Sequence, residues 1–532
     1  MRILIFHGYL LSGTGSNVYN ERLAEALVGI GHEVHLLSQD RHPERQPFVN
    51  AAGDWDGGEL RLNELSTPDS LGRCVVYRPN IGGLLPVYVQ DDYEGIEART
   101  FSNCSDAEIG AYIQANVEAV RDVVERVGPE VALANHLVMG PVILARALPE
   151  RIPYAVKVHG SALEYTVKPE PERFLAYARE GLARARGVLV GSRHTAESLW
   201  EAMGDSRELK RRTRLGPPGV DIERFSPRDA IEAESEMKGL LERLRASPPA
   251  EEQASAFARD NSRAAYAVEK ILDRSGPLVA FVGKLIVSKG VDLVLAAWPL
   301  VLQGAPDARL VVIGFGAYRE ALENLLARLA AGDLEGAKEI ARAGRALEAH
   351  SAAAGAPETP MAGVPLKHLL AFLDSMDNAE EDAYRAAARA LGEQILFTGR
   401  LDHAELADVL PACEALVVPS TFPEAFGMVA AEAAACGALP VSANHSGLAE
   451  VSEAIAAEVP REAAGWLSFP IDDNAVRAIA RCLLGWLEAN DELKALTRSA
   501  LVSVVRERWS WEGVARGVIE AARGEPVARP FG

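Results

Sequence analysis

The stretch ALVVPSTFPEAFGMVAAEAAACGALPVSAN, residues 415–444, contains the local pattern that decides the fold. It begins and ends with short apolar runs, and the alanine-rich segment between them favours a helix that ends at Gly437. Strands joined through a helix lie parallel in one sheet, and apolar runs without polar alternation indicate strands buried on both faces. The stretch therefore predicts a strand–helix–strand unit of a doubly wound α/β domain.

Apolar runs of the same kind recur along the chain and fall into two series separated by helix-period segments. The first series comprises residues 2–8, 33–39, 131–137, 154–160 and 188–192, and the second comprises residues 278–285, 308–316, 395–401, 415–420 and 439–444. We therefore expect an α/β protein with two tandem Rossmann-like doubly wound domains that face a cleft. Its ligands should bind at the carboxyl ends of the strands.

The predicted domain boundaries follow changes in composition. Residues 1–227 form the first Rossmann-like domain and residues 276–508 the second. Residues 228–275 and 331–391 are rich in Ala, Glu and Arg and lack β-branched runs, which predicts helical insertions on the surface. A lid or an oligomer contact is the less favoured alternative for them. Residues 509–532 contain a further helical pattern.

The composition is that of a globular enzyme or binding protein. The 532 residues are 48% hydrophobic and 24% charged, and such a chain is too long for one ordinary core. The 55 basic and 75 acidic side chains give a net charge of −20, which disfavours a nucleic acid partner. The five cysteines lie far apart, so we predict neither a disulfide framework nor a zinc site.

The first ten residues, MRILIFHGYL, are interpreted as a buried strand. His7 and Gly8 interrupt the apolar run too early for a signal peptide. No run approaches the ~18 apolar residues that span a membrane. A cytoplasmic location is expected, with peripheral association at the inner membrane face as the lesser alternative if the protein acts on a lipid.

The glycine-rich segment GYLLSGTGSN, residues 8–17, is a candidate phosphate-binding turn because it follows the first predicted strand and precedes a helix. A dinucleotide fingerprint would need a third glycine where Val18 stands, so no nicotinamide cofactor is predicted. A tight turn in which Gly13 and Gly15 supply positive φ angles explains the glycines equally well.

Lys284 and Lys289 lie in FVGKLIVSKGVDLVLAAW, residues 281–298, between a predicted strand and the next helix. Two ammonium groups at the mouth of a cleft suit a diphosphate, whose charge must be neutralised when the bond to it breaks. Lysines are more often solvated surface residues. The strand–loop–helix junction favours the binding role here.

Glu424 and Glu432 lie on either side of a predicted helix start near Gly427. A helix N-terminus attracts phosphate, and Glu432 is ~7.5 Å further along the axis. Carboxylates accept paired hydroxyl groups, so this spacing favours a ligand with a central phosphate and hydroxyl-bearing rings on both sides, as in a nucleotide sugar. A glycosidase pair is disfavoured because the helix N-terminus would draw an anion into the reaction space.

The combined pattern resembles the retaining GT-B glycosyltransferases of the large family that contains sucrose-phosphate synthases and bacterial glycolipid and thiol-precursor transferases. Residues 423–451, PEAFGMVAAEAAACGALPVSANHSGLAEV, match the family's E-x7-E element. GKLIVSKGVD (283–292) resembles its basic segment, PPGVDIERFSP (217–227) its interdomain segment and HGSALEY (159–165) its N-domain histidine loop. Residues 509–524 resemble the family's last helix, which returns to the first domain.

The resemblance implies a role for each candidate residue. Lys284 and Lys289 hold the diphosphate and stabilise it as the leaving group, Glu424 binds hydroxyls of the donor sugar, and Glu432 binds the ribose. His159 lies near the reacting sugar. The remaining implied donor-binding positions are Gly13, Thr14, Gly15, Gly399, Arg400, Leu401, Ala425, Phe426, Gly427, Met428 and Val429.

The implied reaction is transfer of a sugar from a UDP-, GDP- or ADP-sugar to a hydroxyl of a small-molecule, saccharide or lipid acceptor, with retained anomeric configuration. No cofactor beyond this co-substrate and no metal is expected. Asp54 and Asp56 have the DxD spacing of metal-dependent glycosyltransferases, but their segment is interpreted as a solvated loop. A nucleotide-sugar epimerase or hydrolase on the same fold, and a non-catalytic nucleotide-sugar sensor, are the alternatives.

Overall fold

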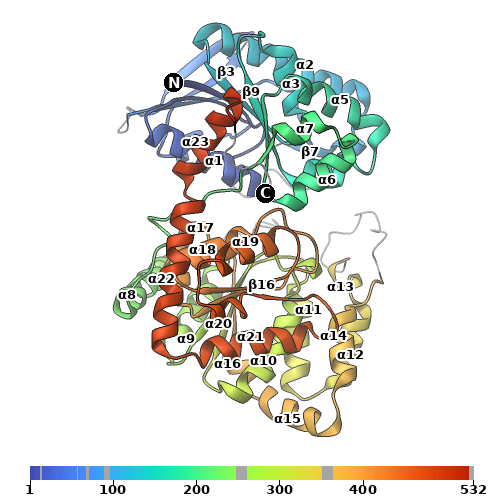
Figure 1. The fold of residues 1–532 in the computed structure, drawn as a ribbon, viewed down its shortest axis with the longest axis vertical. Helices are drawn as coiled ribbons and strands as arrows, with labels where there is room; N and C mark the ends of the chain where they lie inside the picture. The colour runs from blue at the N-terminus through green and yellow to red at the C-terminus, as the bar shows by residue number, and fades with distance from the viewer. Residues whose placement is uncertain are drawn as a thin grey trace. The chain divides into compact units, whose positions relative to one another are not determined.

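The computed structural model describes residues 1–11, 15–56, 58–66, 71–88, 96–246, 260–349 and 363–526, so the predicted donor-binding residues Gly13 and Thr14 lie outside the described residues. The chain divides into two compact units (Figure 1). The first comprises Met1–Gly219 and Trp509–Gly532, and the second comprises Val220–Arg508. The division after Gly219 lies inside the segment PPGVDIERFSP rather than at its end.

The sheet of the first unit has the strand order β11-β10-β9-β8-β1-β2-β5-β3-β4. The five predicted strands are present as β1 (Arg2–Phe6), β2 (Glu33–Leu37), β8 (Val131–Asn135), β9 (Tyr154–Val158) and β10 (Gly187–Val190). They pair in parallel, which confirms the doubly wound prediction. Strand β1 lies where the strand order reverses, with β2 on one side and β8 on the other.

Further strands of this unit were not predicted. They are β3 (Val49–Asp56), β4 (Glu59–Glu64), β5 (Arg73–Arg78) and β11 (Thr213–Leu215) in the main sheet, and β6 (Leu84–Val87) and β7 (Glu97–Thr100) in a separate pair. The solvated loop predicted around Asp54 and Asp56 was wrong, because both residues lie in β3, which pairs antiparallel with β4. Arg78 donates to Asp54 at 2.7 Å, and Arg61 lies 2.9 Å from Asp56.

The sheet of the first unit is covered by helices on both faces. These helices are α1 (Gly15–Gly29), α2 (Asp106–Val127), α3 (Gly140–Ala147), α4 (Gly160–Ala162), α5 (Pro171–Ala183), α6 (Arg193–Met203), α7 (Arg207–Arg212) and α23 (Trp511–Arg523). Because side chains alternate along a strand, Ile3 and Ile5 pack with α1 and α23, while Leu4 and Phe6 pack with α2, α3 and α5. The closing helix α23 thus completes the core of the first unit (Figure 1).

The second unit contains a parallel sheet in the order β14-β13-β12-β15-β16-β17. Its strands are β12 (Leu278–Val282), β13 (Arg309–Ile313), β14 (Ile395–Gly399), β15 (Ala415–Val418), β16 (Leu439–Ala443) and β17 (Ser468–Phe469), and all five predicted strands are among them. The strand order reverses between β12 and β15. In open α/β sheets, ligands bind at the carboxyl ends of strands at such a point.

The helices of the second unit include those predicted for both insertions. They are α8 (Ala230–Ala246), α9 (Asn261–Leu272), α10 (Val291–Gly304), α11 (Arg319–Ala330), α12 (Leu334–Ala343), α13 (Ala346–Ala349), α14 (Lys367–Ser375), α15 (Asn378–Ala388), α16 (Leu391–Gln394), α17 (His403–Val409), α18 (Met428–Ala435), α19 (Ser446–Ala456), α20 (Arg461–Ala464), α21 (Ala475–Leu487) and α22 (Asp491–Arg508). No described helix combines the length and apolar character needed to cross a bilayer.

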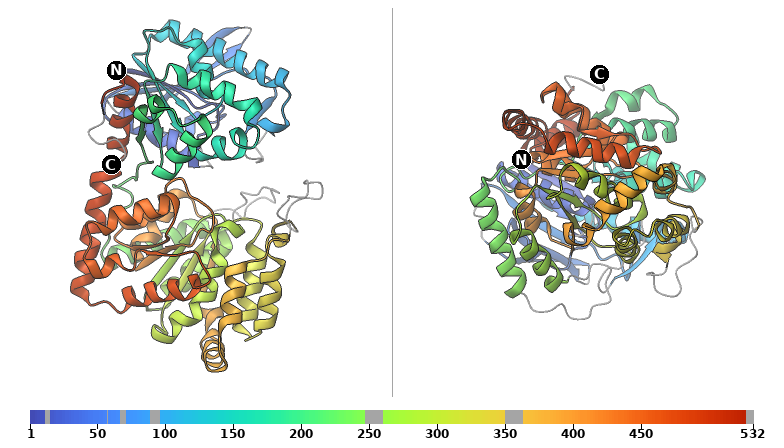
Figure 2. Two further views of the ribbon diagram at one scale, coloured as in Figure 1. Left: turned by 45° about the vertical axis from the view of Figure 1, so that its right-hand side comes forward. Right: turned by 90° about the horizontal axis from the view of Figure 1, so that it is seen from below.

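The inserted helices are packed into the second unit more deeply than the predicted surface placement implies. Tyr384 of α15 is fully buried and donates its hydroxyl hydrogen to the Ala296 carbonyl of α10 at 2.9 Å. Val268 and Ile271 of α9 are also buried, and α9 packs against β14. The yellow and orange helices α12 and α14 lie side by side in this layer (Figure 2).

Candidate functional site

The predicted basic and acidic residues of the second unit lie on neighbouring loops at its sheet reversal. Lys284 and Lys289 lie between β12 and α10, and Glu424 lies between β15 and α18. Lys284 is exposed, whereas Lys289 and Glu424 are partly buried. Because β12 and β15 pair directly, residues that are 135 positions apart in the sequence come into contact.

The two loops are held together by their backbones. The Thr421 N–H donates to the Ser288 carbonyl at 2.8 Å. Gly290 has a φ of +65°, and a Cβ atom there would lie 2.1 Å from the Pro419 carbonyl oxygen. Only glycine allows this approach, so the loop that carries Lys289 is fixed against the loop that precedes Glu424.

Lys289 and Glu424 form an ion pair through Nζ and Oε1. The hydroxyl of Ser420 donates to the same carboxylate oxygen at 2.7 Å. The lysine and glutamate side chains remain 30% and 25% exposed, so a ligand can reach both. An ammonium group has three donors, and Lys289 can therefore bind phosphate oxygens while keeping Glu424 in place.

The start of helix α19, which follows β16, positions the backbone of Glu424. The Ser446 hydroxyl accepts from the Glu424 N–H at 2.9 Å, and the Gly447 N–H donates to the Glu424 carbonyl at 2.9 Å. His445 Nε2 donates to the Ser420 carbonyl at 2.7 Å. These three residues were not predicted as site residues. Their signal was available, because they directly follow the predicted strand at residues 439–444.

Helix α18 begins at Met428, close to the predicted start, and Gly437 follows its end with a φ of +82°. Gly427 precedes the helix with a φ of +123°, and no side chain of the described residues caps this N-terminus. Its first N–H groups, including those of Met428 and Val429, have no intrahelical acceptor. The N-terminus of α18 can therefore bind an anion next to Glu424.

Glu432 lies inside α18 and is buried, with 4% of its side chain exposed. Its Oε1 accepts a hydrogen bond from His403 Nε2 at 2.7 Å. His403 begins α17, just after the predicted base-contacting segment Gly399–Leu401 at the end of β14. The ring of Phe225 lies 4.8 Å from that of His403. His403 was missed because nothing in the local sequence links it to a residue 29 positions away.

The segment after β14 is shaped by its backbone and by one arginine. Gly399 has a φ of +79° and its carbonyl accepts from the Gly314 N–H at 3.0 Å. The Arg400 guanidinium lies 3.2 Å from the Asp402 carboxylate, and Leu401 is buried. The positive φ of Gly399 lies at the carboxyl edge of the sheet.

His159 of the first unit follows β9 and lies beside two other histidines. His7 follows β1 and His136 follows β8, so adjacent strands deliver all three rings to one edge of the sheet. The ring centroids of His136 and His159 are 4.8 Å apart, and those of His7 and His136 are 6.1 Å apart. Burial lowers the pKa of His7 to about 4 and holds the pKa values of His136 and His159 well below the ordinary value. All three imidazoles are neutral at neutral pH.

Gly15 is the first residue of α1 and is exposed. A Cβ atom at this position would meet no atom of the described residues within 4 Å. Gly15 does not have a positive φ, so the prediction that it supplies a left-handed turn was wrong at this position. Packing among the described residues does not demand a glycine there either.

Two Rossmann-like α/β units with parallel sheets form the GT-B fold, and the second unit carries the paired lysine and glutamate at its sheet reversal. Family models match both units: the glycosyl transferase 4-like domain at residues 14–210 and glycosyl transferases group 1 at residues 369–500. The chain belongs to the group 1 glycosyltransferases with the GT-B fold.

Individual relatives are distant. The D-inositol 3-phosphate glycosyltransferase of Segniliparus rotundus is 27% identical over 267 residues, which cover 50% of this chain and 44% of that protein. The match thus spans less than half of that relative. Sucrose-phosphate synthase from Thermosynechococcus elongatus shares the fold with a TM-score of 0.54, 17% identity and 98% coverage of both chains. Anabaena HepE in complex with UDP and glucose gives a TM-score of 0.51, 15% identity and coverage of 98% and 99%.

Proposed function

We propose that the protein transfers a sugar from a nucleoside diphosphate sugar to an acceptor hydroxyl and retains the anomeric configuration. The observation that carries this proposal is the Lys289–Glu424 pair at the sheet reversal, followed by the uncapped N-terminus of α18. A cation, a carboxylate and a helix N-terminus suit the phosphate and the hydroxyl groups of one nucleotide sugar. The binding of UDP and glucose by Anabaena HepE supports this donor class.

In the proposed complex, Lys284, Lys289 and the N-terminus of α18 bind the diphosphate. Glu424 accepts hydrogen bonds from hydroxyl groups of the donor sugar. Glu432 binds the ribose, and His403 holds one oxygen of its carboxylate in place. The segment Gly399–Leu401 lies beside the base.

The proposed chemistry is dominated by charge on the leaving group. As the bond between the sugar C1 and the diphosphate oxygen breaks, negative charge grows on the phosphate, and both lysines and the helix dipole stabilise it. The acceptor oxygen forms the new bond to C1 on the same face. Its proton passes to a phosphate oxygen of the departing nucleotide, so the step needs no protein nucleophile. No metal has a role in this proposal.

The proposal is tested by measuring nucleoside diphosphate release with a panel of UDP-, GDP- and ADP-sugars, with and without candidate acceptors. We expect release that depends on the acceptor. Release together with an isomerised sugar would instead identify an epimerase, release that does not depend on any acceptor would identify a hydrolase, and tight binding without turnover would identify a sensor.

Two substitutions test the site itself. Lys289→Ala and Glu424→Ala should each lower kcat/KM by about 10²- to 10³-fold, the usual effect of removing a group that stabilises transition-state charge. Lys238→Ala is the matched control, because Lys238 forms an exposed pair with Glu234 on α8. Near-wild-type turnover of both site variants would refute the assignment.

A further inference from the structure

We propose that a chain of buried amides, which runs from His7 through Asn20 and Asn135, fixes His159 as the tautomer protonated on Nε2. Its Nδ1 is then left to accept a hydrogen bond from a hydroxyl group of a ligand bound at this edge of the first unit's sheet. The identity of that ligand rests on the proposed function, whereas the tautomer does not. Asn20 and Asn135 are positioning residues that act through His159.

Three side-chain hydrogen bonds link His7 (after β1), Asn20 of α1, Asn135 of β8 and the partly buried His159 (after β9). His159 Nε2 lies 3.0 Å from Asn135 Oδ1, and Asn135 Nδ2 lies 2.7 Å from Asn20 Oδ1. Asn20 Nδ2 lies 3.1 Å from His7 Nδ1. Both asparagines and His7 are almost fully buried, so water does not compete for these bonds.

Backbone carbonyls fix the direction of the two amides. Asn135 Nδ2 also lies 3.2 Å from the Phe6 carbonyl, and Asn20 Nδ2 lies 2.8 Å from the Ser16 carbonyl. A carbonyl oxygen only accepts hydrogen bonds, so each amide must present its nitrogen to that carbonyl. The amide oxygen of Asn135 is therefore directed at His159.

At the other end of this row of hydrogen bonds, a backbone carbonyl also fixes the proton position on His7. His7 Nε2 lies 2.9 Å from the Leu10 carbonyl and must carry the proton. Its Nδ1 is then free to accept from Asn20. Because burial makes His7 neutral at neutral pH, this single tautomer satisfies both ring nitrogens.

The direction of the Asn135 amide determines which ring nitrogen of His159 carries the proton. The Asn135 oxygen can only accept, so His159 Nε2 must carry a proton. Burial, with His136, Lys157 and His7 nearby, holds the pKa of His159 well below its ordinary value, so Nδ1 carries no proton at neutral pH. No residue in the described part of the chain forms a hydrogen bond with this Nδ1.

An unprotonated Nδ1 selects the chemistry of its partner. A sugar hydroxyl can donate to it, whereas a carboxylate or a fully ionised phosphate oxygen has no proton to give. None of the neighbouring groups described next donates a hydrogen bond to Nδ1 in place of a ligand hydroxyl. Lys157, whose pKa burial lowers to about 7, donates to the Gly216 carbonyl, and the Tyr19 and His136 rings lie 5.3 and 4.8 Å from His159.

The test is a long-range proton–nitrogen NMR correlation on the full chain with ¹⁵N-labelled histidine, with His159→Gln used to assign the signal. We expect the Nε2–H tautomer for His159, unchanged between pH 8 and pH 6. Asn135→Leu should abolish this single tautomer and raise KM for the donor or the acceptor by about tenfold, the effect of ~1.4 kcal/mol, with a smaller effect on kcat. Asn116→Leu is the matched control, because Asn116 is a buried amide of α2 that donates to the Tyr112 carbonyl.

A second variant keeps the test decisive if Asn135→Leu does not fold. Asn135→Asp keeps the acceptor but adds a negative charge, so His159 should become doubly protonated as the pH falls from 8 to 6. A wild-type His159 that is protonated on Nδ1, or charged at pH 7, would overturn the inference. If the tautomer is as expected but no nucleotide sugar is turned over, the proposed function fails and the hydrogen-bond chain stands.

Discussion

Lys289 and Glu424 are more important for ligand chemistry than for stability. Their side chains are about one-quarter to one-third exposed, and such ion pairs contribute on the order of 1 kcal/mol or less to folding. Lys289→Ala should therefore lower the melting temperature about as little as the control Lys238→Ala does. A large loss of stability for Lys289→Ala alone would show that its effect on turnover arises from unfolding.

Asp292 carries a buried carboxyl group in the first turn of α10, and burial raises its pKa to about 7. The helix dipole favours an anion here by only about 0.3–1 kcal/mol, so desolvation dominates. Between pH 4 and pH 7 the folded chain holds a proton that the unfolded chain has lost. This group therefore reduces stability as the pH rises through that range.

Asp292→Asn removes this pH-dependent cost. The stability advantage of the variant over the wild type should be smallest near pH 4 and should grow towards pH 8 by up to about 4 kcal/mol. Thermal unfolding at pH 5 and pH 8 measures the difference. An advantage that stays constant or shrinks with rising pH would show that the carboxyl group is charged in the folded state.

His403 orients Glu432 through one hydrogen bond, and its removal should weaken donor binding. His403→Ala is expected to raise the donor KM by about tenfold, the effect of a lost hydrogen bond to a charged group. The change in kcat should be small, because the ribose does not react. His403→Gln should restore part of the affinity. A variant with unchanged KM but low kcat would place His403 at the reacting bond instead.

The sequence allowed prediction of the lysine and glutamate positions because each follows an apolar strand. It did not reveal His403, whose role depends on a contact with a residue 29 positions away. His445 and Ser446 also follow a predicted strand, but they were overlooked as site residues. Nor did the sequence predict the buried amides Asn20 and Asn135, whose hydrogen bonds exist only once β1, β8 and β9 lie side by side.

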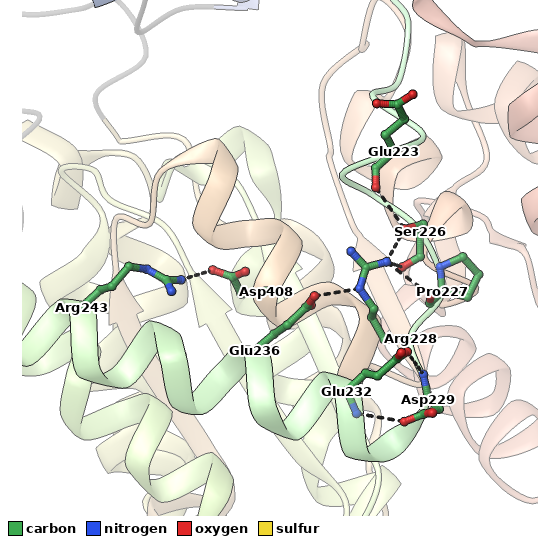
Figure 3. A network of polar contacts seen from close by, with 9 residues as sticks. All are labelled: Glu223, Ser226, Pro227, Arg228, Asp229, Glu232, Glu236, Arg243 and Asp408. Carbon is green, nitrogen blue, oxygen red and sulfur yellow. Dashed lines mark hydrogen bonds and ion pairs between the residues drawn. The ribbon is translucent and has the colours of Figure 1, made fainter.

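Helix α8 is joined to the linker before it and to α17 by a polar network (Figure 3). Arg228 donates to Glu236 of α8 at 2.8 Å, and Arg243 of α8 donates to Asp408 of α17 at 2.5 Å. Helix α17 also carries His403. The insertion therefore supports the helix that positions the buried Glu432.

Apolar contacts, rather than this network, should hold α8 in place. Leu240 is fully buried, and Leu240→Ala should destabilise the second unit by about 2–5 kcal/mol. Arg243 is 57% exposed, and Arg243→Ala should cost less than about 1 kcal/mol. Denaturant unfolding of both variants tests the ranking, which the reverse order of effects would contradict.

At the scale of elements, the sequence indicated most of the strands that are apolar on both faces, but it missed β5, whose residues 74–77 are buried. It failed between residues 41 and 130, where β3 and β4 form an antiparallel pair. The sequence of strand β4, ELRLNE, has no apolar run that would mark it as a strand. This agrees with the strand's largely exposed position. The helical content of both insertions was predictable from composition, whereas their packing required the tertiary structure.

The first unit depends on a helix from the end of the chain. Trp511, Val518 and Ile519 of α23 join the core formed by α1 and the sheet. Burying each of these side chains contributes about 1.5–3 kcal/mol, and the sum approaches the stability of a whole domain.

A chain truncated after Arg508 should therefore lose the melting transition of the first unit. The transition of the second unit, which ends at Arg508, should remain and serves as the internal control. Calorimetry of the truncated and full-length chains separates the two transitions. Two transitions at unchanged temperatures would contradict the assignment of α23 to the first core.

The central claim is the retaining transfer of a sugar from a nucleoside diphosphate donor. The most direct measurement incubates the full chain with the panel of nucleotide sugars and acceptors and determines the anomeric configuration of the product by NMR. We predict a product with the anomeric configuration of the donor, nucleoside diphosphate in equal amount, and loss of both in Lys289→Ala. An inverted product, or no transfer from any donor of the panel, would contradict the account.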